Sequence, residues 1–248
     1  NKIMKLLIFI SFLFFCLSCL KQPVAEQIRE VASEEQLITT CDYSKLSDSM
    51  RSPKTIDEVT DLINSLPKPL SLACLVKSLK RPLKINMTLS RLSAQPAVGT
   101  DSPRIFIFLD DLILSIAPAG KGADLLELSE MYSDKLSLKS ELKFPIKEQI
   151  TYQTGFDRIS LGDKTTCRAC HNNESLDNTG GKVNAYTSVA LKPESKFSLA
   201  SFRQEVYQCE LQEKLDYRCQ LILAVAFGNS MIDTDFPSAT PTWIESIL

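Results

Sequence analysis

The spacing of apolar residues changes twice along the chain, and each change marks a different kind of predicted structure. Between Thr55 and Pro67 the apolar residues recur at helical spacing, and Asp57 and Glu58 fall in the first turn. The pattern therefore predicts one short amphipathic helix in this segment. A second helix is predicted in residues 69–79, where four leucines and one cysteine occupy the candidate buried positions.

The central part of the chain has the period of two that is typical of β-strands. Residues 83–89 alternate between apolar and polar side chains, which predicts a half-buried strand. Two apolar runs, 105–109 and 112–116, are separated by a pair of aspartates and predict a bent strand or a hairpin. Residues 136–144 alternate again. We therefore expect residues 81–150 to form a small antiparallel sheet or sandwich.

The last hundred residues change character once more. Glycine-containing loops precede an amphipathic helical region in residues 199–227, and residues 228–241 have the Ser, Thr, Asp and Pro content of a loop. The expected fold class is α+β, with an N-terminal helical segment, a small antiparallel β-region in the centre and a mainly α-helical C-terminal domain. The predicted domains are a helix plus β-rich accessory domain in 55–150 and a C-terminal domain in 151–248.

The N-terminus has the pattern of an export signal. Lys2 and Lys5 precede an apolar run, and the uncharged stretch from residue 6 to residue 20 is 15 residues long. A helix needs roughly 20 residues to cross a bilayer, so a secretory signal peptide is favoured over a transmembrane anchor. Residues 20–54 are polar and irregular, which predicts a tether.

The tripeptide Leu17-Ser18-Cys19 resembles the lipobox of bacterial lipoproteins. The resemblance implies a signal peptide in residues 1–19, with Cys19 as the lipid-modified residue that anchors the protein to a membrane. Leu20 stands where aspartate usually retains such proteins in the inner membrane, which implies the outer membrane, facing the periplasm. Cys16 departs from the lipobox pattern, so release as a soluble periplasmic protein is the alternative.

Charge excludes one class of partner. Lys and Arg number 28 against 30 Asp and Glu, so the chain has no basic excess with which to bind nucleic acid. We therefore expect membrane contact through the N-terminal lipid and no nucleic-acid partner.

Eight cysteines are present, and two of them belong to the export segment. If two more attach a cofactor, four remain, an even number that suits two disulfides in an oxidising compartment. The predicted pairs are Cys41 with Cys74 and Cys209 with Cys219.

The second pair implies a turn. Residues ten apart in one helix are separated by about 15 Å along its axis, whereas bridged α-carbons lie within about 7 Å of each other. We therefore place a turn at residues 214–216, with a second helix after it. Two buried thiols in one long helix are the alternative.

The strongest chemical signal is Cys167-Arg168-Ala169-Cys170-His171, which resembles the CxxCH attachment motif of c-type cytochromes. The resemblance implies one covalent haem c, with thioether bonds to Cys167 and Cys170 and with His171 as an iron ligand. His171 is the only histidine in the chain. A helical turn beginning near Thr166 would place both thiols at one edge of a porphyrin, and Thr165 or Thr166 is its expected N-cap.

Other interpretations of the motif remain open. Cys167 and Cys170 could form a structural disulfide, or could bind zinc together with Cys209 and Cys219. A thioredoxin-like redox pair would need a preceding strand in a βαβ unit, which residues 157–164 do not clearly provide.

Since no second histidine exists, a sixth iron ligand would be a methionine, a lysine or an N-terminal amine. Met231 lies 60 residues after His171, as in the small monohaem cytochromes c, although a core or loop methionine is an equal alternative. That resemblance covers residues 160–248 at most. The segments Leu66-Pro67-Lys68-Pro69 and Ser102-Pro103-Arg104-Ile105-Phe106 resemble uncharacterised predicted lipoproteins of bacteria.

Three functions are compatible with these patterns. The first is one-electron transfer in the cell envelope by a membrane-tethered monohaem protein, with a redox partner that the sequence does not identify. The second is a haem enzyme or gas sensor with an open distal site. The third is a structural or binding lipoprotein without haem, in which the CxxC pair is a disulfide.

Overall fold

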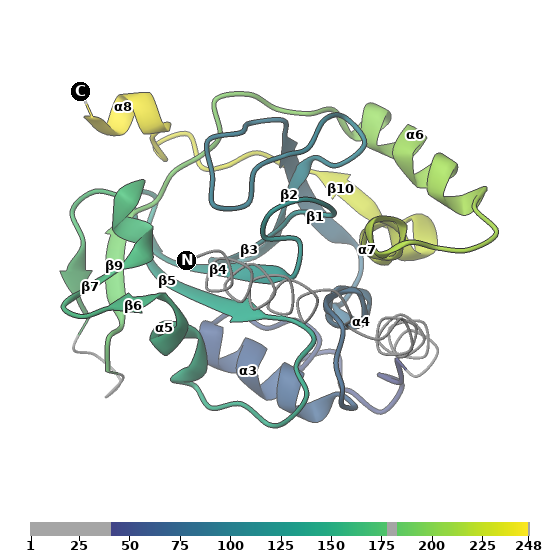
Figure 1. Cartoon of the computed structure of the whole chain (residues 1–248), viewed down its shortest axis with the longest axis horizontal. Coiled ribbons are helices and arrows are strands. Elements are labelled where there is room, and N and C mark those ends of the chain that lie inside the picture. Colours follow the sequence, from purple (N-terminus) through teal and green to yellow (C-terminus); the bar gives the residue numbers. More distant parts are fainter. Residues whose placement is uncertain (1–40, 178–182, 248) are drawn as a thin grey trace, which may run out of the picture. The chain divides into compact units, whose positions relative to one another are not determined.

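A single eight-stranded sheet organises this computed structural model, which describes residues 41–177 and 183–247 (Figure 1). The strand order is β10-β1-β2-β3-β4-β5-β9-β8, and among these strands only β1 and β10 pair in parallel. The strands are β1 (Leu83–Thr88), β2 (Arg104–Leu109), β3 (Leu112–Ile116), β4 (Leu125–Ser133), β5 (Leu136–Lys143), β8 (Ser175–Leu176), β9 (Tyr186–Val189) and β10 (Met231–Asp233). A separate small hairpin consists of β6 (Ser160–Leu161) and β7 (Lys164–Thr165).

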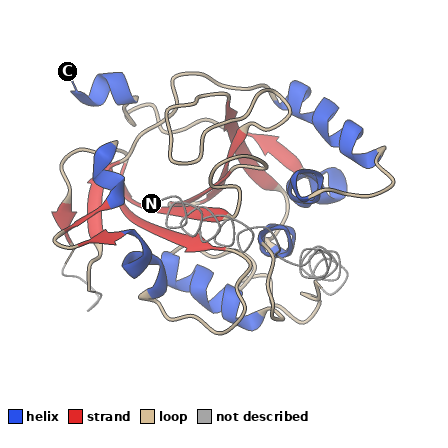
Figure 2. Cartoon of the chain, viewed as in Figure 1, coloured by secondary structure: helices blue, strands red, loops and turns tan. Residues whose placement is uncertain are grey.

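The helices lie around this sheet (Figure 2). Thr55 begins the first of them by accepting a hydrogen bond from the Glu58 amide at 3.2 Å, while the Glu58 carboxylate accepts one from the Lys54 amide at 2.6 Å. This reciprocal arrangement is close to a capping box. The helices are α3 (Ile56–Ser65), α4 (Leu72–Ser78), α5 (Thr154–Ile159), α6 (Leu199–Glu210), α7 (Tyr217–Ala226) and α8 (Trp243–Ile247), with 3-10 turns η1 (Thr166–Ala169) and η3 (Phe227–Asn229).

One face of the sheet is apolar and is part of the main core. Alternate residues of the strands, such as Ile85, Leu114 and Leu128, are almost fully buried in one cluster with apolar residues of α3, α4 and α7. The Glu130 carboxylate accepts a hydrogen bond from the Ile56 amide at 2.8 Å, which places a negative charge at the N-terminus of α3.

The opposite face of the sheet, called the polar face below, carries charged and hydroxyl side chains together with Phe106, Phe108 and Ile113. Residues that pair directly across neighbouring strands share a face, and the register places polar partners together between β1 and β2 and across β3, β4 and β5. The pairs are Thr88 with Arg104, Ser115 with Glu127, Ser129 with Lys139 and Glu127 with Glu141.

Both predicted disulfides are confirmed. Cys41 bonds to Cys74, and Cys209 bonds to Cys219 with their α-carbons 5.1 Å apart. The chain turns between α6 and α7 as expected, and the Asp216 carboxylate caps α7 by accepting from the Cys219 amide at 2.7 Å. The alternative of one long helix is therefore wrong.

The predicted fold class is also wrong. The C-terminal part of the chain is not mainly helical, because it contributes β8, β9 and β10 to the same sheet as β1–β5. Residues 231–233, expected to be loop, form β10 beside β1, with Met231 opposite Leu83. Strands of two to four residues are too short to show a period of two, so their pairing depends on neighbours distant in the sequence.

Some predictions lie outside the residues that the structure describes. These are the signal peptide, the lipid anchor at Cys19 and the first part of the tether. Within residues 41–177 and 183–247, none of the helices is both long and apolar enough to span a bilayer.

Candidate cofactor-binding site

A cavity of about 580 Å³ lies over the polar face of the sheet. This volume is within the range of roughly 300–1,000 Å³ that is usual for small-molecule sites. Side chains of β1–β5 form one part of its lining. The other part comes from the loops before β2 and after β9, from the CxxCH turn and from Trp243 at the start of α8.

The CxxCH segment has the local structure that its sequence predicts. It forms the 3-10 turn η1, and the Thr165 hydroxyl caps this turn by accepting from the Cys167 amide at 3.1 Å. The amides of Cys170 and His171 both donate to the Cys167 carbonyl, at 3.1 and 2.9 Å. The predicted helical turn and its N-cap are therefore confirmed.

A carboxylate holds the start of this turn. Glu174 accepts hydrogen bonds from both the amide, at 2.9 Å, and the hydroxyl of Thr165. Because the Thr165 hydroxyl donates to Glu174 and accepts from Cys167, the three residues form a continuous chain of hydrogen bonds. Glu174 lies only four residues after Cys170, but its sequence position has no pattern that would predict this role.

The fold brings Cys167, Cys170 and His171 together on the lining of the cavity. In the part of the chain that the structure describes, these two cysteines are the free thiols, while the other four are disulfide-bonded. Cys170 is exposed and Cys167 is half-buried. The motif is thus presented to an internal space and not to a packed core.

The imidazole of His171 is fixed by the sheet. Its Nδ1 lies 2.7 Å from the carbonyl oxygen of Val189 in β9. A carbonyl can only accept, so Nδ1 carries the proton of a neutral ring and Nε2 keeps the lone pair. Burial, and next the positive charge of Lys139, lower the pKa of His171 to about 3, so the ring is neutral at physiological pH. Metal-binding histidines commonly hold their second ring nitrogen in this way.

The thiol of Cys167 is not activated. Burial is the main cause that raises its pKa to about 11, so it stays protonated near neutral pH. A redox or nucleophilic cysteine needs a lowered pKa. The preceding residues form the hairpin β6–β7 and not a βαβ unit. Both observations disfavour a thioredoxin-like role.

The zinc interpretation is wrong, because Cys209 and Cys219 are bonded to each other. Within the described ranges, moreover, no group of three or more His, Cys, Asp and Glu residues could hold a metal ion.

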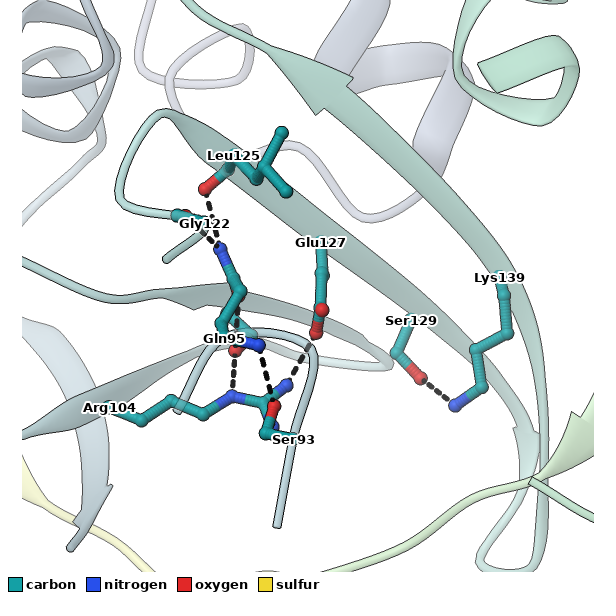
Figure 3. A network of polar contacts seen from close by, with 9 residues as sticks. Ser93, Gln95, Arg104, Gly122, Leu125, Glu127, Ser129 and Lys139 are labelled. Carbon is teal, nitrogen blue, oxygen red and sulfur yellow. Dashed lines mark hydrogen bonds and ion pairs between the residues drawn. The ribbon is translucent and has the colours of Figure 1, made fainter. Parts of the chain in front are cut away.

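A polar network forms part of the cavity lining (Figure 3). Arg104 donates to Glu127 at 2.5 Å, to Ser115 at 2.7 Å and to Ser93. Gln95 donates to two backbone carbonyls of the β3–β4 connection, at 3.0 and 2.8 Å. These bonds attach the loop before β2 to the sheet, so the lining is held from two sides.

Lys139 extends the polar surface toward the motif. It lies in the middle of β5 with only 9% of its surface exposed, and its Nζ donates to the Ser129 hydroxyl at 3.0 Å (Figure 3). Burial lowers its pKa to about 8, against a raising effect of Cys167 and Glu127. The sequence pattern does not distinguish Lys139 from the other polar residues of the alternating segment 136–144.

The structure does not bring Met231 to the motif. Met231 is 7% exposed and packs in the main core. Its register partner Leu83 belongs to the apolar face of the sheet, whereas the cavity lies on the other face. A different methionine, Met131 of β4, lines the cavity, although its sequence spacing from the motif does not predict this.

The prediction that residues 151–248 form a cytochrome c-like domain is wrong. Residues 151–248 are shared between the sheet and surrounding helices, Met231 is a core residue, and the structure gives no positive sign of a cytochrome c domain. Comparison of the chain with protein-family models, with curated proteins and with solved structures finds no match.

Proposed function

We propose that the chain binds one haem covalently in this cavity, through Cys167 and Cys170, with His171 as an axial ligand. The observation that carries the proposal is the placement of all three side chains on the lining of one cavity, with His171 Nδ1 occupied by Val189. Fold and site chemistry are separable, so covalent haem does not require a cytochrome c fold.

The rest of the cavity suits a flat, mostly apolar ring with two carboxylates. Phe106, Phe236 and Trp243 supply aromatic surface, and Phe236 packs edge-on against Phe106 with ring centroids 5.0 Å apart. Arg91 and Lys192 are the more exposed cations of the lining and are available to the carboxylates. The other requirement, a neutral imidazole, is met by the low pKa of His171.

Haem iron supplies one-electron chemistry, which the protein tunes through the axial ligands and through burial. We propose electron transfer in the cell envelope, with a redox partner still to be identified. The lipobox-like Cys19 would tether the protein to a membrane, on the periplasmic side of the outer membrane. A soluble periplasmic form remains the alternative.

One observation favours a second candidate, a haem enzyme or gas sensor. The cavity is large and has ionisable groups on its lining, among them Arg104, Glu127 and Lys139. Such groups could stabilise a small ligand if one axial position stayed open. A binding lipoprotein without haem is the third candidate, and it requires that Cys167 and Cys170 be oxidised to a disulfide.

The test is export of the full chain in a host that matures c-type cytochromes. We expect haem that stays on the chain after denaturation, a pyridine haemochrome spectrum of the two-thioether type and a mass increase of one haem. The Cys167→Ala, Cys170→Ala double variant should lose all three signals. Arg168→Ala, an exposed substitution inside the same motif, is the matched control and should keep them.

A colourless wild-type chain, from cells that load a reference cytochrome c, would refute the haem proposal. Thiol titration of the same sample would then decide between two free cysteines and a Cys167–Cys170 disulfide.

A further inference from the structure

The cavity contains a buried amine that no carboxylate neutralises. The only hydrogen bond of Lys139 Nζ within the described part of the chain goes to the Ser129 hydroxyl, and no carboxylate there lies at ion-pair distance from it. The nearby carboxylates are otherwise engaged, since Glu127 pairs with Arg104 and Glu141 pairs with Arg158 at 2.7 Å. A buried ammonium without a counter-ion is unfavourable, so burial makes the proton of Lys139 easier to remove.

A neutral lysine amine is a nitrogen ligand for iron. The Lys139 amine is aimed into the cavity without a carboxylate partner, so no ion pair has to break before it can bind a metal. Binding to a metal would also remove the unpaired buried charge.

Lys139 lies close to the motif. Its charge acts on both Cys167 and His171, and all three residues line the same cavity. Its backbone pairs with Ser129 of β4, the preceding residues 136–138 pair with β9, and the Ser129 hydroxyl orients its amine. Met131, the other candidate donor, is partly exposed and lies where the β4–β5 register shifts. The geometry therefore favours Lys139 over Met131.

We propose that Lys139 is the second axial ligand of the haem iron, so that the site is closed by histidine and lysine. This inference rests on the proposed haem attachment. It also selects among the candidate functions, because a six-coordinate, low-spin haem suits electron transfer and not ligand activation.

The first test needs no variant. The ferric wild-type protein should give the electron paramagnetic resonance and near-infrared spectra of a low-spin haem with two nitrogen ligands. An iron–methionine charge-transfer band or a high-spin spectrum in the wild type would overturn the inference while leaving covalent haem intact. Haem content is measured separately, and absence of haem would refute both proposals.

The second test replaces the amine. Lys139→Ala should convert the ferric haem to high spin and lower the apparent Kd for cyanide by about tenfold or more, because cyanide no longer has to displace a ligand. Lys139→Met should shift the spectrum toward iron–methionine coordination. Lys143→Ala replaces an exposed lysine of the same strand that does not line the cavity, and it is the matched control, with an unchanged spectrum.

Met131→Ala should also leave the low-spin spectrum unchanged. A high-spin Met131→Ala protein, or a low-spin Lys139→Ala protein with wild-type spectra, would show that Lys139 is not the ligand.

Discussion

The Nδ1 atom of His171 lies 2.7 Å from the carbonyl oxygen of Val189, and this contact joins the CxxCH turn to the central sheet. Val189 pairs with Leu136 of β5, three residues before Lys139. At the start of the turn, the Thr165 hydroxyl accepts a hydrogen bond from the Cys167 amide, and the Thr165 amide donates one to Glu174. The position of the imidazole thus depends on contacts at both ends of a short segment, and these contacts can be tested separately.

Glu174→Ala should loosen the start of the turn. The substitution removes a charged acceptor from the amide and hydroxyl of buried Thr165, which should lower the free energy of unfolding by about 1–3 kcal/mol. Urea denaturation measures the loss. Glu148→Ala, at an exposed glutamate, is the control and should change stability by less than about 0.5 kcal/mol. Equal stability of the two variants would mean that Glu174 does not hold the turn.

The two disulfides should differ in their contribution to stability because they close loops of different length. The sequence separations are 33 residues for Cys41–Cys74 and 10 for Cys209–Cys219. The chain-entropy relation gives about 3.7 and about 2.7 kcal/mol respectively. Paired Cys→Ala variants, compared by urea denaturation, should therefore rank Cys41–Cys74 as the more stabilising bond. The reverse order would show that packing around the sulfur atoms outweighs loop entropy.

Local patterns predicted the elements whose residues interact with near neighbours in the sequence. The alternation at 83–89 predicted β1, and the two apolar runs around the aspartate pair predicted the β2–β3 hairpin. Strand β5 begins at residue 136, as the third alternating segment predicted. The α6–α7 turn followed from the distance that a disulfide between Cys209 and Cys219 can bridge.

The cavity could not be predicted in the same way, because its lining comes from segments between residues 88 and 243. Met231 had the sequence spacing of an iron ligand, but parallel pairing with β1 turns it into the core. Lys139 had no distinctive signal, since its burial depends on the loops that cover the polar face of the sheet. A three-residue strand such as β10 likewise has no period of its own.

Arg81 should be a major contributor to stability outside the site. Its guanidinium donates to the carbonyls of Val225 at 2.6 Å, Ala224 at 2.5 Å and Val76 at 3.2 Å, which are at or near the C-terminal ends of α7 and α4. Arg81→Ala leaves these carbonyls without a charged donor, and we expect a loss of about 2–4 kcal/mol in the free energy of unfolding. Thermal and urea denaturation measure the loss. Lys84→Ala, at an exposed residue of β1, is the control and should have almost no effect on the free energy of unfolding.

Lys139 should make the stability of the haem-free chain depend on alkaline pH. Its pKa is about 8 in the folded chain and 10.5 as a model value, so between these pH values the unfolded chain binds more protons. Stability must then rise with pH from about 8 to about 10.5, and the burial cost is fully present below pH 8. The upper limit of this burial cost is about 3.4 kcal/mol, at 1.36 kcal/mol per pKa unit.

The measurement compares two proteins in the Cys167→Ala, Cys170→Ala background, one with Lys139 and one with Lys139→Met. The free energy of unfolding of the Lys139 protein should approach that of the methionine protein as the pH increases through this window. A difference that stays constant from pH 7 to pH 10.5 would mean that Lys139 keeps its proton when buried. In that case the amine would stay charged in the cavity of the haem-free chain up to pH 10.5.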